Sequence, residues 1–369
     1  MIKGRATTSG TAAYAARFPN LPGNYRPAMD LAVSSIGIGT YLGEHDARTD
    51  AAYSESLRLA LSSGINLIDT AVNYRMQRSE RVIGQVLKES VEIGMLKREE
   101  VVIATKGGYV TFDGDMPPDP RTWFQEHFVR TGIVQPGDLV DGSHCMTPKW
   151  LAAMIELSRA NLGVETIDIY YVHNPENQLA QIGRTDFRRR LQHAFELLER
   201  KTADGVIGCY GAATWNGFRI ESAERAYLSL AEIIEAAERV AGHNHHFRII
   251  QLPYNLAMTE AFTARNQPIP GDGLGNTLAA AEAAGITVCA SASLLQGRLS
   301  RRLPPLLEEA FGGLGSDAQR AVQFVRSTPG VSCALVGMST AAHVRDIIAT
   351  AERPPAPFDS MMKLFQSAE

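Results

Sequence analysis

Ile65-Asn-Leu-Ile-Asp-Thr-Ala-Val-Asn-Tyr74 is an apolar, strand-like run that ends in an aspartate and, five residues later, a tyrosine. The pattern returns in Val101-Val-Ile-Ala-Thr-Lys-Gly107, which ends in a lysine, and in Ile167-Asp-Ile-Tyr-Tyr-Val-His-Asn174, which ends in a histidine. Short apolar runs rich in β-branched residues are typical of buried strands. In a parallel barrel the functional residues gather at the C-terminal ends of the strands. The sequence therefore predicts that these four polar residues meet at one site.

Strand-like and helix-like patterns alternate eight times along the 369 residues of the chain. Glycines stand between several helical patterns and the strands that follow them, as at Gly64 and Gly163, where they suit helix C-terminal caps. Eight strand-then-helix units predict an α/β protein with a single-domain (β/α)8 TIM barrel. The predicted strands cover residues 35–40, 66–71, 101–106, 168–174, 206–212, 249–254, 287–292 and 333–337.

Three segments lie outside this alternation. Residues 1–33 form an N-terminal extension that either closes the bottom of the barrel or lies on its surface. Residues 107–147 form a long insertion after the third strand, and a loop of this length is commonly functional or disordered. Its aromatic residues predict either a lid over the site or a small satellite core. Residues 353–369 form a C-terminal tail, which either frays or folds back over the site.

Composition excludes several classes of protein. The formal net charge of −4 and the pI of about 6.2 are not those of a nucleic-acid or membrane-surface binder. No apolar stretch reaches the roughly 18 residues of a membrane span, and the N-terminus lacks the apolar core of a signal peptide. The four cysteines show no CxxC or Cys-His metal-binding spacing, which suits a reducing compartment. We therefore expect a cytoplasmic protein.

The four polar residues suit one chemistry, the transfer of a proton to a carbonyl oxygen. Tyr74 is the candidate general acid, because a phenol keeps its proton at neutral pH. Lys106 is expected to favour the phenolate and ease proton release. Asp69 would hold the lysine in place, and His173 would hydrogen-bond the substrate oxygen.

The order Asp, Tyr, Lys, His in these contexts resembles the aldo-keto reductase family. Asp69-Thr-Ala with Tyr74 matches the family's first signature, Ala104-Thr-Lys106 its lysine strand, Tyr171-Val-His173 its histidine strand, and Gln251-Leu-Pro-Tyr-Asn255 its sixth strand. The resemblance extends from about residue 34 to about residue 350. It implies an NAD(P)H-dependent oxidoreductase that reduces an aldehyde or ketone to an alcohol.

The resemblance also implies which residues bind the cofactor, NADP with NAD as the alternative. Two positions depart from the family: Ala213-Thr214 replaces a Ser-Asn pair, and Ser291 replaces a tyrosine that stacks on the nicotinamide. An aromatic residue of the insertion, such as Trp123 or Phe128, is a candidate substitute for that stack. The implied cofactor positions are Thr214, Gln251, Ser293, Leu294, Gly297, Arg298, Gly337, Met338, Ser339 and His343.

Two other functions compete with this interpretation. The departures near the nicotinamide favour a non-catalytic nucleotide-binding barrel that acts as a redox sensor or scaffold, whereas the retained tyrosine and lysine oppose it. A metal-dependent hydrolase would need several histidines at strand ends, and only His173 meets that condition. The His243-Asn-His-His246 run has a metal-like composition but enters the sixth strand, far from the predicted site. No metal is therefore expected, and the substrate is predicted only as a small carbonyl compound.

Overall fold

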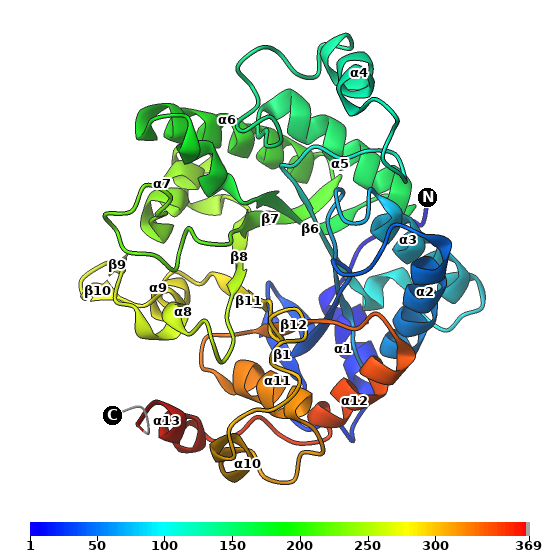
Figure 1. Cartoon of the computed structure of the whole chain (residues 1–369), viewed down its shortest axis with the longest axis vertical. Coiled ribbons are helices and arrows are strands. Elements are labelled where there is room, and N and C mark those ends of the chain that lie inside the picture. The colour runs from blue at the N-terminus through cyan, green and yellow to red at the C-terminus, as the bar shows by residue number, and fades with distance from the viewer. Residues whose placement is uncertain (367–369) are drawn as a thin grey trace.

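The computed structural model describes residues 1–366, and its centre is a closed barrel of eight parallel strands (Figure 1). Each predicted strand is found, with its ends within two residues of the predicted bounds. The prediction of a (β/α)8 barrel is therefore confirmed. In the order in which they pair around the barrel, the strands are β11 (Thr287–Ser291), β12 (Cys333–Gly337), β3 (Ile36–Gly39), β4 (Leu67–Asp69), β5 (Val102–Gly107), β6 (Ile167–His173), β7 (Ile207–Ala213) and β8 (Phe247–Pro253).

A ring of helices surrounds the barrel and buries one face of each helix against it. In the first of them, Tyr53, Leu57 and Leu61 form the buried face. Gly163 ends a later helix in the left-handed conformation (φ +64°), which a residue without a side chain adopts at low cost. The main helices are α2 (Ala47–Ser62), α3 (Arg78–Glu92), α5 (Pro148–Leu162), α6 (Arg184–Ala203), α7 (Leu230–Ala241), α9 (Thr277–Ala283), α11 (Asp317–Ser327) and α12 (Ala341–Ala351).

Shorter elements complete the chain. Before the barrel come a helix and a two-stranded hairpin, and several short segments lie in the loops. They are α1 (Thr8–Ala16), β1 (Tyr25–Ala28), β2 (Leu31–Ser34), η1 (Arg98–Glu100), α4 (Pro120–Phe124), η2 (Gln125–Val129), η3 (Pro175–Ala180), η4 (Gly242–Asn244), α8 (Glu260–Thr263), β9 (Gln267–Ile269), β10 (Gly273–Gly275), α10 (Leu306–Ala310) and α13 (Phe358–Gln366).

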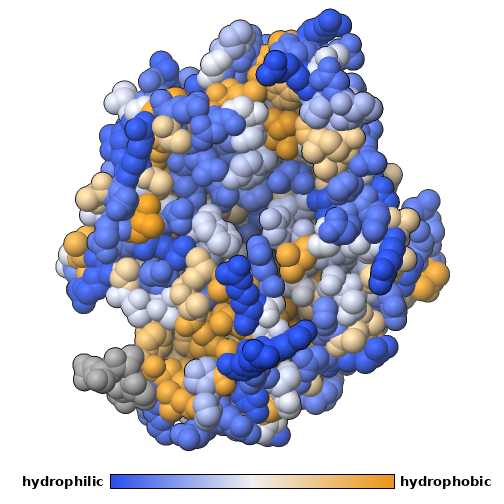
Figure 2. Space-filling model, viewed as in Figure 1, coloured by the Kyte–Doolittle hydropathy of each residue, from blue (hydrophilic) through white to orange (hydrophobic). Residues whose placement is uncertain are grey.

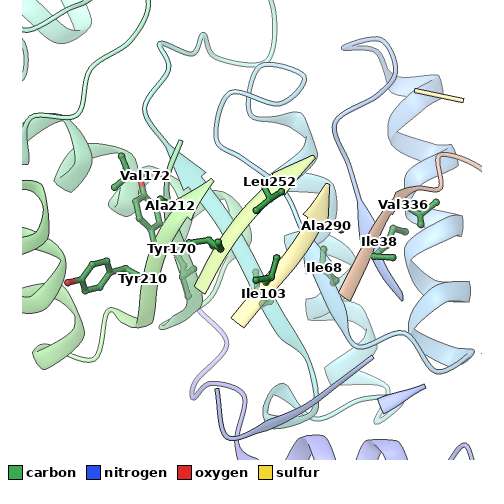
Figure 3. Packing of buried hydrophobic residues seen from close by; sticks show 14 of the residues in the cluster. Ile38, Ile68, Ile103, Tyr170, Val172, Tyr210, Ala212, Leu252, Ala290 and Val336 are labelled. Carbon is green, nitrogen blue, oxygen red and sulfur yellow. The ribbon is translucent and has the colours of Figure 1, made fainter. Parts of the chain in front are cut away.

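Alternation along the strands separates two cores. Ile103 of β5 and Tyr170 of β6 belong to the larger cluster, which packs the strands against the helices (Figure 3). Their neighbours Ala104 and Tyr171 belong to a second cluster inside the barrel. Because successive strand residues point to opposite faces, Lys106 shares the inward direction of Ala104. This alternation aims the polar residues at the strand ends toward the barrel axis.

The N-terminal extension closes the bottom of the barrel, as one of the two predictions for it proposed. Ala28 and Val33 of the β1–β2 hairpin are buried in the interior cluster. Asn66, just before β4, ties the hairpin down: its Oδ1 accepts from the Ser34 N–H at 2.8 Å, and its Nδ2 donates to the Ala32 carbonyl at 2.8 Å. The opposite end of the barrel is thus left as the open end.

Most of the aromatic residues of the 107–147 insertion form a satellite core. The Trp123 ring stacks on His127 at 4.0 Å between centroids, and Phe128 packs against Trp150 of α5 at 4.8 Å. In Figure 1, α4 lies at the edge of the molecule, beside the outer helices. A lid function for the insertion stays a prediction, but Phe128 packs on α5 and the Trp123 ring packs within the insertion itself.

The tail follows the outside of the barrel as far as residue 366. Met361 of α13 is buried, and the Phe365 ring lies 5.5 Å from Phe262 and 6.1 Å from Phe324. The part of the tail that the structure describes therefore packs on α8 and α11. The last three predicted tail residues, 367–369, lie outside the described residues.

Candidate active site

A cavity of about 940 Å³ opens at the C-terminal end of the barrel strands. Its size suits a bound organic molecule. Figure 2 shows a hollow near the centre of the face that it draws, over the barrel strands. Three of the four candidate catalytic residues, Asp69, Tyr74 and His173, line the cavity. The fourth, Lys106, lies at its base with no exposed surface.

Lys106 and Asp69 form a buried ion pair. The Lys106 Nζ donates to the Asp69 Oδ1 at 2.6 Å and to the Thr70 carbonyl at 2.7 Å. Burial lowers the pKa of Lys106, and the Asp69 carboxylate opposes that shift. The pair survives without water because each charge has a partner of opposite sign and further hydrogen bonds.

Gln251 completes the bonding of this carboxylate. It lies on β8, where the alternation also turns its side chain into the barrel, and its Nε2 donates to the Asp69 Oδ2 at 2.7 Å. The two oxygens of Asp69 thus receive one donor each, from Lys106 and from Gln251. The sequence predicts Gln251 only as a cofactor residue, and its bond to Asp69 is visible only in the fold.

Tyr74 lies directly above the lysine. Its ring centroid is 5.0 Å from the Lys106 Nζ and 6.0 Å from the His173 ring. Burial raises the pKa of Tyr74 well above its usual value, and the Asp69 charge raises it further. The effect expected of Lys106, which is to favour the phenolate, is not the dominant one here, because loss of hydration on burial is the largest influence on this pKa. Tyr74 is therefore held as a neutral phenol.

His173 is a neutral imidazole. Burial lowers its pKa well below the usual value, and the nearby Lys106 charge adds to this effect. Its Nδ1 is buried and has no hydrogen-bond partner among residues 1–366. The backbone of His173 is held by a second histidine, because the His144 Nε2 donates to the His173 carbonyl at 2.6 Å.

Most of the implied cofactor positions lie together along the cavity, and two do not. Met338 is completely buried in the larger core, and Arg298 is exposed and outside the cavity wall. Arg301, three residues further along the chain, lines the cavity instead. The positions that do line it are Thr214, Gln251, Ser293, Leu294, Gly297, Gly337, Ser339 and His343.

Two observations fit a bound dinucleotide at this wall. The Thr214 Oγ1 is buried without a partner in the described part of the chain, so a polar ligand group would satisfy it. The turn after β11 contains Leu295, Gln296 and Gly297 in succession with φ of 45°, 54° and 84°. The Leu295 N–H donates to the Ala292 carbonyl at 2.7 Å, so the N–H groups of Gln296 and Gly297 are the ones that can face an anion, as in phosphate-binding loops.

The two aromatic residues proposed from sequence to replace the missing nicotinamide stack do not lie at the cavity. Trp123 and Phe128 are outside the cavity wall, because they pack in the satellite core. The exposed aromatic side chains at the cavity are Tyr41 and Trp215. Sequence reasoning missed both. Each follows the end of a strand by two residues, and that position was the available signal.

Glu176 shapes the turn that carries Trp215. Its Oε1 accepts the backbone N–H groups of Trp215 at 2.7 Å and Asn216 at 3.0 Å. Burial raises the pKa of this carboxyl group despite those bonds. The sequence gives no local sign of this residue, because its partners lie 39 and 40 positions away.

The histidine-rich run lies away from the cavity wall. The His243 Nδ1 pairs with Glu238, and the His246 Nδ1 pairs with Glu199. Within residues 1–366, no three His, Cys, Asp or Glu side chains come together in a way that could hold a metal ion. Among the same residues, no helix is both long and apolar enough to cross a membrane.

Comparisons with known proteins agree with this geometry. The D-threo-aldose 1-dehydrogenase of a Pseudomonas species is 29% identical over 186 residues, which is 50% of this chain and 51% of the relative. The NADH-specific methylglyoxal reductase of Escherichia coli K12 is 29% identical over 212 residues, 55% of this chain and 54% of the relative. The chain thus spans about half the length of these curated relatives.

Solved structures match over nearly the whole fold. An aldo-keto reductase of Bacillus halodurans in its holo form covers 95% of this chain and 97% of its own, with a TM-score of 0.63 and 19% identity. An aldo/keto reductase of Klebsiella pneumoniae, in complex with NADP and acetate, covers 94% of this chain and 95% of its own, with a TM-score of 0.62 and 20% identity. At such identities the likeness shows the fold. A model of the aldo/keto reductase family matches residues 35–303, and the chain belongs to that family.

Proposed function

We propose that this protein is an oxidoreductase that uses a nicotinamide nucleotide to reduce the carbonyl group of a small aldehyde or ketone to an alcohol. The observation that carries the proposal is the convergence of Asp69, Tyr74, Lys106 and His173 at one end of the cavity. Membership of the aldo/keto reductase family supports it. The relatives named above are, by their names, enzymes of aldose and methylglyoxal chemistry, which also fits a small carbonyl substrate.

Tyr74 is the proposed general acid. Its raised pKa keeps the phenol protonated, so it can donate to a carbonyl oxygen that is gaining negative charge. Neutral His173 would hydrogen-bond the same oxygen from the other side. Lys106, held by Asp69, would stabilise the phenolate that forms after transfer. The cation thus acts in the transition state, while the resting phenol keeps its proton.

The proposed cofactor is NADP, with NAD as the alternative, and when bound it supplies the hydride. Thr214 and Gln251 would hold the nicotinamide end, and the turn containing Ser293 and Gly297 would receive the phosphates. At the far end of the cavity, Arg301 and His343 are the candidates for contact with a 2′-phosphate.

The second candidate function is a cofactor-binding sensor or scaffold. The observation that favours it is the loss of family side chains at Ala213 and Ser291, which leaves the nicotinamide with fewer contacts. Against it stands the buried Asp69–Lys106 pair beneath Tyr74, which a binding protein does not need.

The test is a pair of measurements on the wild-type chain and a Tyr74→Phe variant. Quenching of protein fluorescence by NADPH and by NADH gives the two dissociation constants, and loss of NAD(P)H absorbance gives carbonyl turnover. We expect Tyr74→Phe to lose at least about a hundredfold in kcat while its cofactor affinity changes less than about twofold.

Each outcome separates the two candidates. Tight cofactor binding without turnover of any small carbonyl compound by the wild type would favour the sensor. Retention of most of the turnover by Tyr74→Phe would remove Tyr74 from the acid role. An absence of binding at millimolar cofactor would overturn the oxidoreductase altogether.

A further inference from the structure

Another phenol besides Tyr74 and Tyr41 lines the cavity, and it has no role in the reaction described above. Tyr109, three residues after Lys106, packs its ring edge-on against His173, with the centroids 4.9 Å apart. His173 therefore contacts the rings of both Tyr74 and Tyr109. A substrate whose carbonyl oxygen is held by Tyr74 and His173 would lie close to Tyr109 as well.

The Tyr109 hydroxyl is held by two amide donors. The Asn174 Nδ2 donates to its oxygen at 2.8 Å, and the Asn177 Nδ2 donates to it at 2.6 Å. A phenol oxygen offers one proton and two acceptor positions. The two amides use the acceptor positions, and the proton has no acceptor within the part of the chain that the structure describes.

The backbone around Tyr109 is fixed as firmly as its hydroxyl. Tyr109 forms an isolated β-bridge with His144, whose ring packs against the tyrosine at 5.1 Å. Gly108 allows this approach: a Cβ there would lie 2.6 Å from the His173 carbonyl oxygen and 2.9 Å from the His144 Nε2. Tyr109 is thus clamped between β6 and the end of the insertion, which makes it a preorganised donor.

We propose that Tyr109 is a specificity-determining residue that donates a hydrogen bond to a second oxygen of the substrate. It selects carbonyl compounds that carry a hydroxyl or a second carbonyl on the carbon next to the reacting one. The inference rests on the proposed carbonyl reduction and deepens it. Burial raises the pKa of Tyr109, so the donor keeps its proton at neutral pH. A site built to hydrogen-bond an oxygen discriminates strongly against an analogue that lacks it.

The test compares two ketones of equal carbon skeleton, 3-hydroxy-2-butanone and 2-butanone. NADPH-dependent kcat/KM is measured for both with the wild type and with Tyr109→Phe. We expect the ratio of the two constants, which favours the hydroxyketone in the wild type, to fall about tenfold in Tyr109→Phe. Tyr25→Phe is the matched control, because it removes a phenol at the closed end of the barrel, and its ratio should equal that of the wild type.

Asn177→Ala gives a second route to the same answer. It keeps the phenol and removes one of the amides that orient it, and Asn177 is outside the cavity wall. The ratio should fall in the same direction, and this variant replaces Tyr109→Phe if that one fails to fold. A ratio that stays within about twofold of the wild type in the folded variants overturns the inference, as does an equal loss on both ketones.

Failure of the proposed function is distinguishable from failure of this inference. If the wild type reduces neither of these two ketones, the ratio cannot be measured, and the reductase proposal itself fails only if no small carbonyl compound is turned over. The inference is then tested by ligand-observed NMR, which gives the dissociation constants of the two ketones for protein mixed with NADP⁺. A preference for the hydroxyketone that Tyr109→Phe removes supports it. Equal affinities, or no binding of either ketone to the wild type, overturn it.

Discussion

At the scale of single residues, the stability of the protein is expected to depend strongly on the buried ion pair of Lys106 and Asp69. Each side chain is nearly or completely inaccessible, at 0% and 7% of its surface. Removal of one partner leaves a charge in the barrel interior without its counter-ion, and such losses cost about 3–5 kcal/mol. The same pair would place positive charge under the Tyr74 phenol, so stability and the proposed chemistry depend on the same contact.

We predict that Lys106→Met lowers the free energy of unfolding by about 3–5 kcal/mol in urea titrations. The double variant with Asp69→Asn should regain part of that loss, because the buried carboxylate is then replaced by a neutral amide. Lys88→Met is the matched control: its pair with Glu92 is exposed, at 69% and 61%, and should contribute less than about 1 kcal/mol. A Lys106→Met variant as stable as the Lys88→Met control would contradict the prediction.

At the scale of elements, the end of the insertion is attached to β6 and η3 through His144. The His144 Nε2 donates to the His173 carbonyl, while its Nδ1 accepts from the Gln178 Nε2 at 2.8 Å. The Gln178 amide cannot rotate to offer its oxygen to His144, because that oxygen, Oε1, already accepts a hydrogen bond from Arg190 at 2.7 Å. The junction therefore needs a neutral His144.

This junction predicts a loss of stability in acid. Burial lowers the pKa of His144 from 6.5 to about 4. Below pH 6.5 the unfolded chain binds a proton at this residue and the folded chain does not. The contribution of neutral His144 to the free energy of unfolding is therefore complete above pH 6.5. As the pH falls from 6.5 toward 4, the free energy of unfolding decreases by about 3 kcal/mol at most.

The measurement is the free energy of unfolding between pH 7 and pH 4 for the wild type and for His144→Gln. We expect a smaller decline in the variant, because the titrating group is gone. His243→Gln, at a side chain that is 94% exposed, should decline as the wild type does. Parallel curves for the wild type and His144→Gln would show that this histidine does not titrate on unfolding.

At the scale of the whole molecule, the hairpin under the barrel acts as part of the core. Val33 is 2% exposed and belongs to the interior cluster together with Leu67, Val102 and Ile249 of three barrel strands. Residues early in the chain thus cover the interior of a barrel whose last strand ends near residue 337. Damage here should lower the stability of the whole barrel.

We predict that Val33→Asp lowers the free energy of unfolding by at least about 3 kcal/mol, because a carboxylate would be buried without a partner. Ile93→Asp makes the same change at a residue that is 76% exposed and should stay within about 0.5 kcal/mol of the wild type. Chemical denaturation of both variants gives the comparison. If the two changes cost the same, the hairpin is not part of the cooperative core.

The sequence by itself determined the barrel and the members of the proposed catalytic group. Apolar strand runs alternate with helical patterns, and this local signal predicts all eight strands within two residues of their observed ends. The period of two along each strand then turns Asp69, Lys106 and His173 inward together. Both signals are local, so no knowledge of distant contacts was needed.

Only the tertiary structure decided how these residues are bonded and what surrounds them. Gln251 binds Asp69 across 182 residues of sequence, and Asn174 reaches Tyr109 across 65. The same packing removes Met338, Trp123 and Phe128 from the cavity wall and places Tyr41 and Trp215 there. The physical reason is that hydration and hydrogen bonding depend on neighbours that the fold assembles from distant segments. Burial therefore raises the pKa of Tyr74, whereas its local motif predicts only a tyrosine beside a lysine.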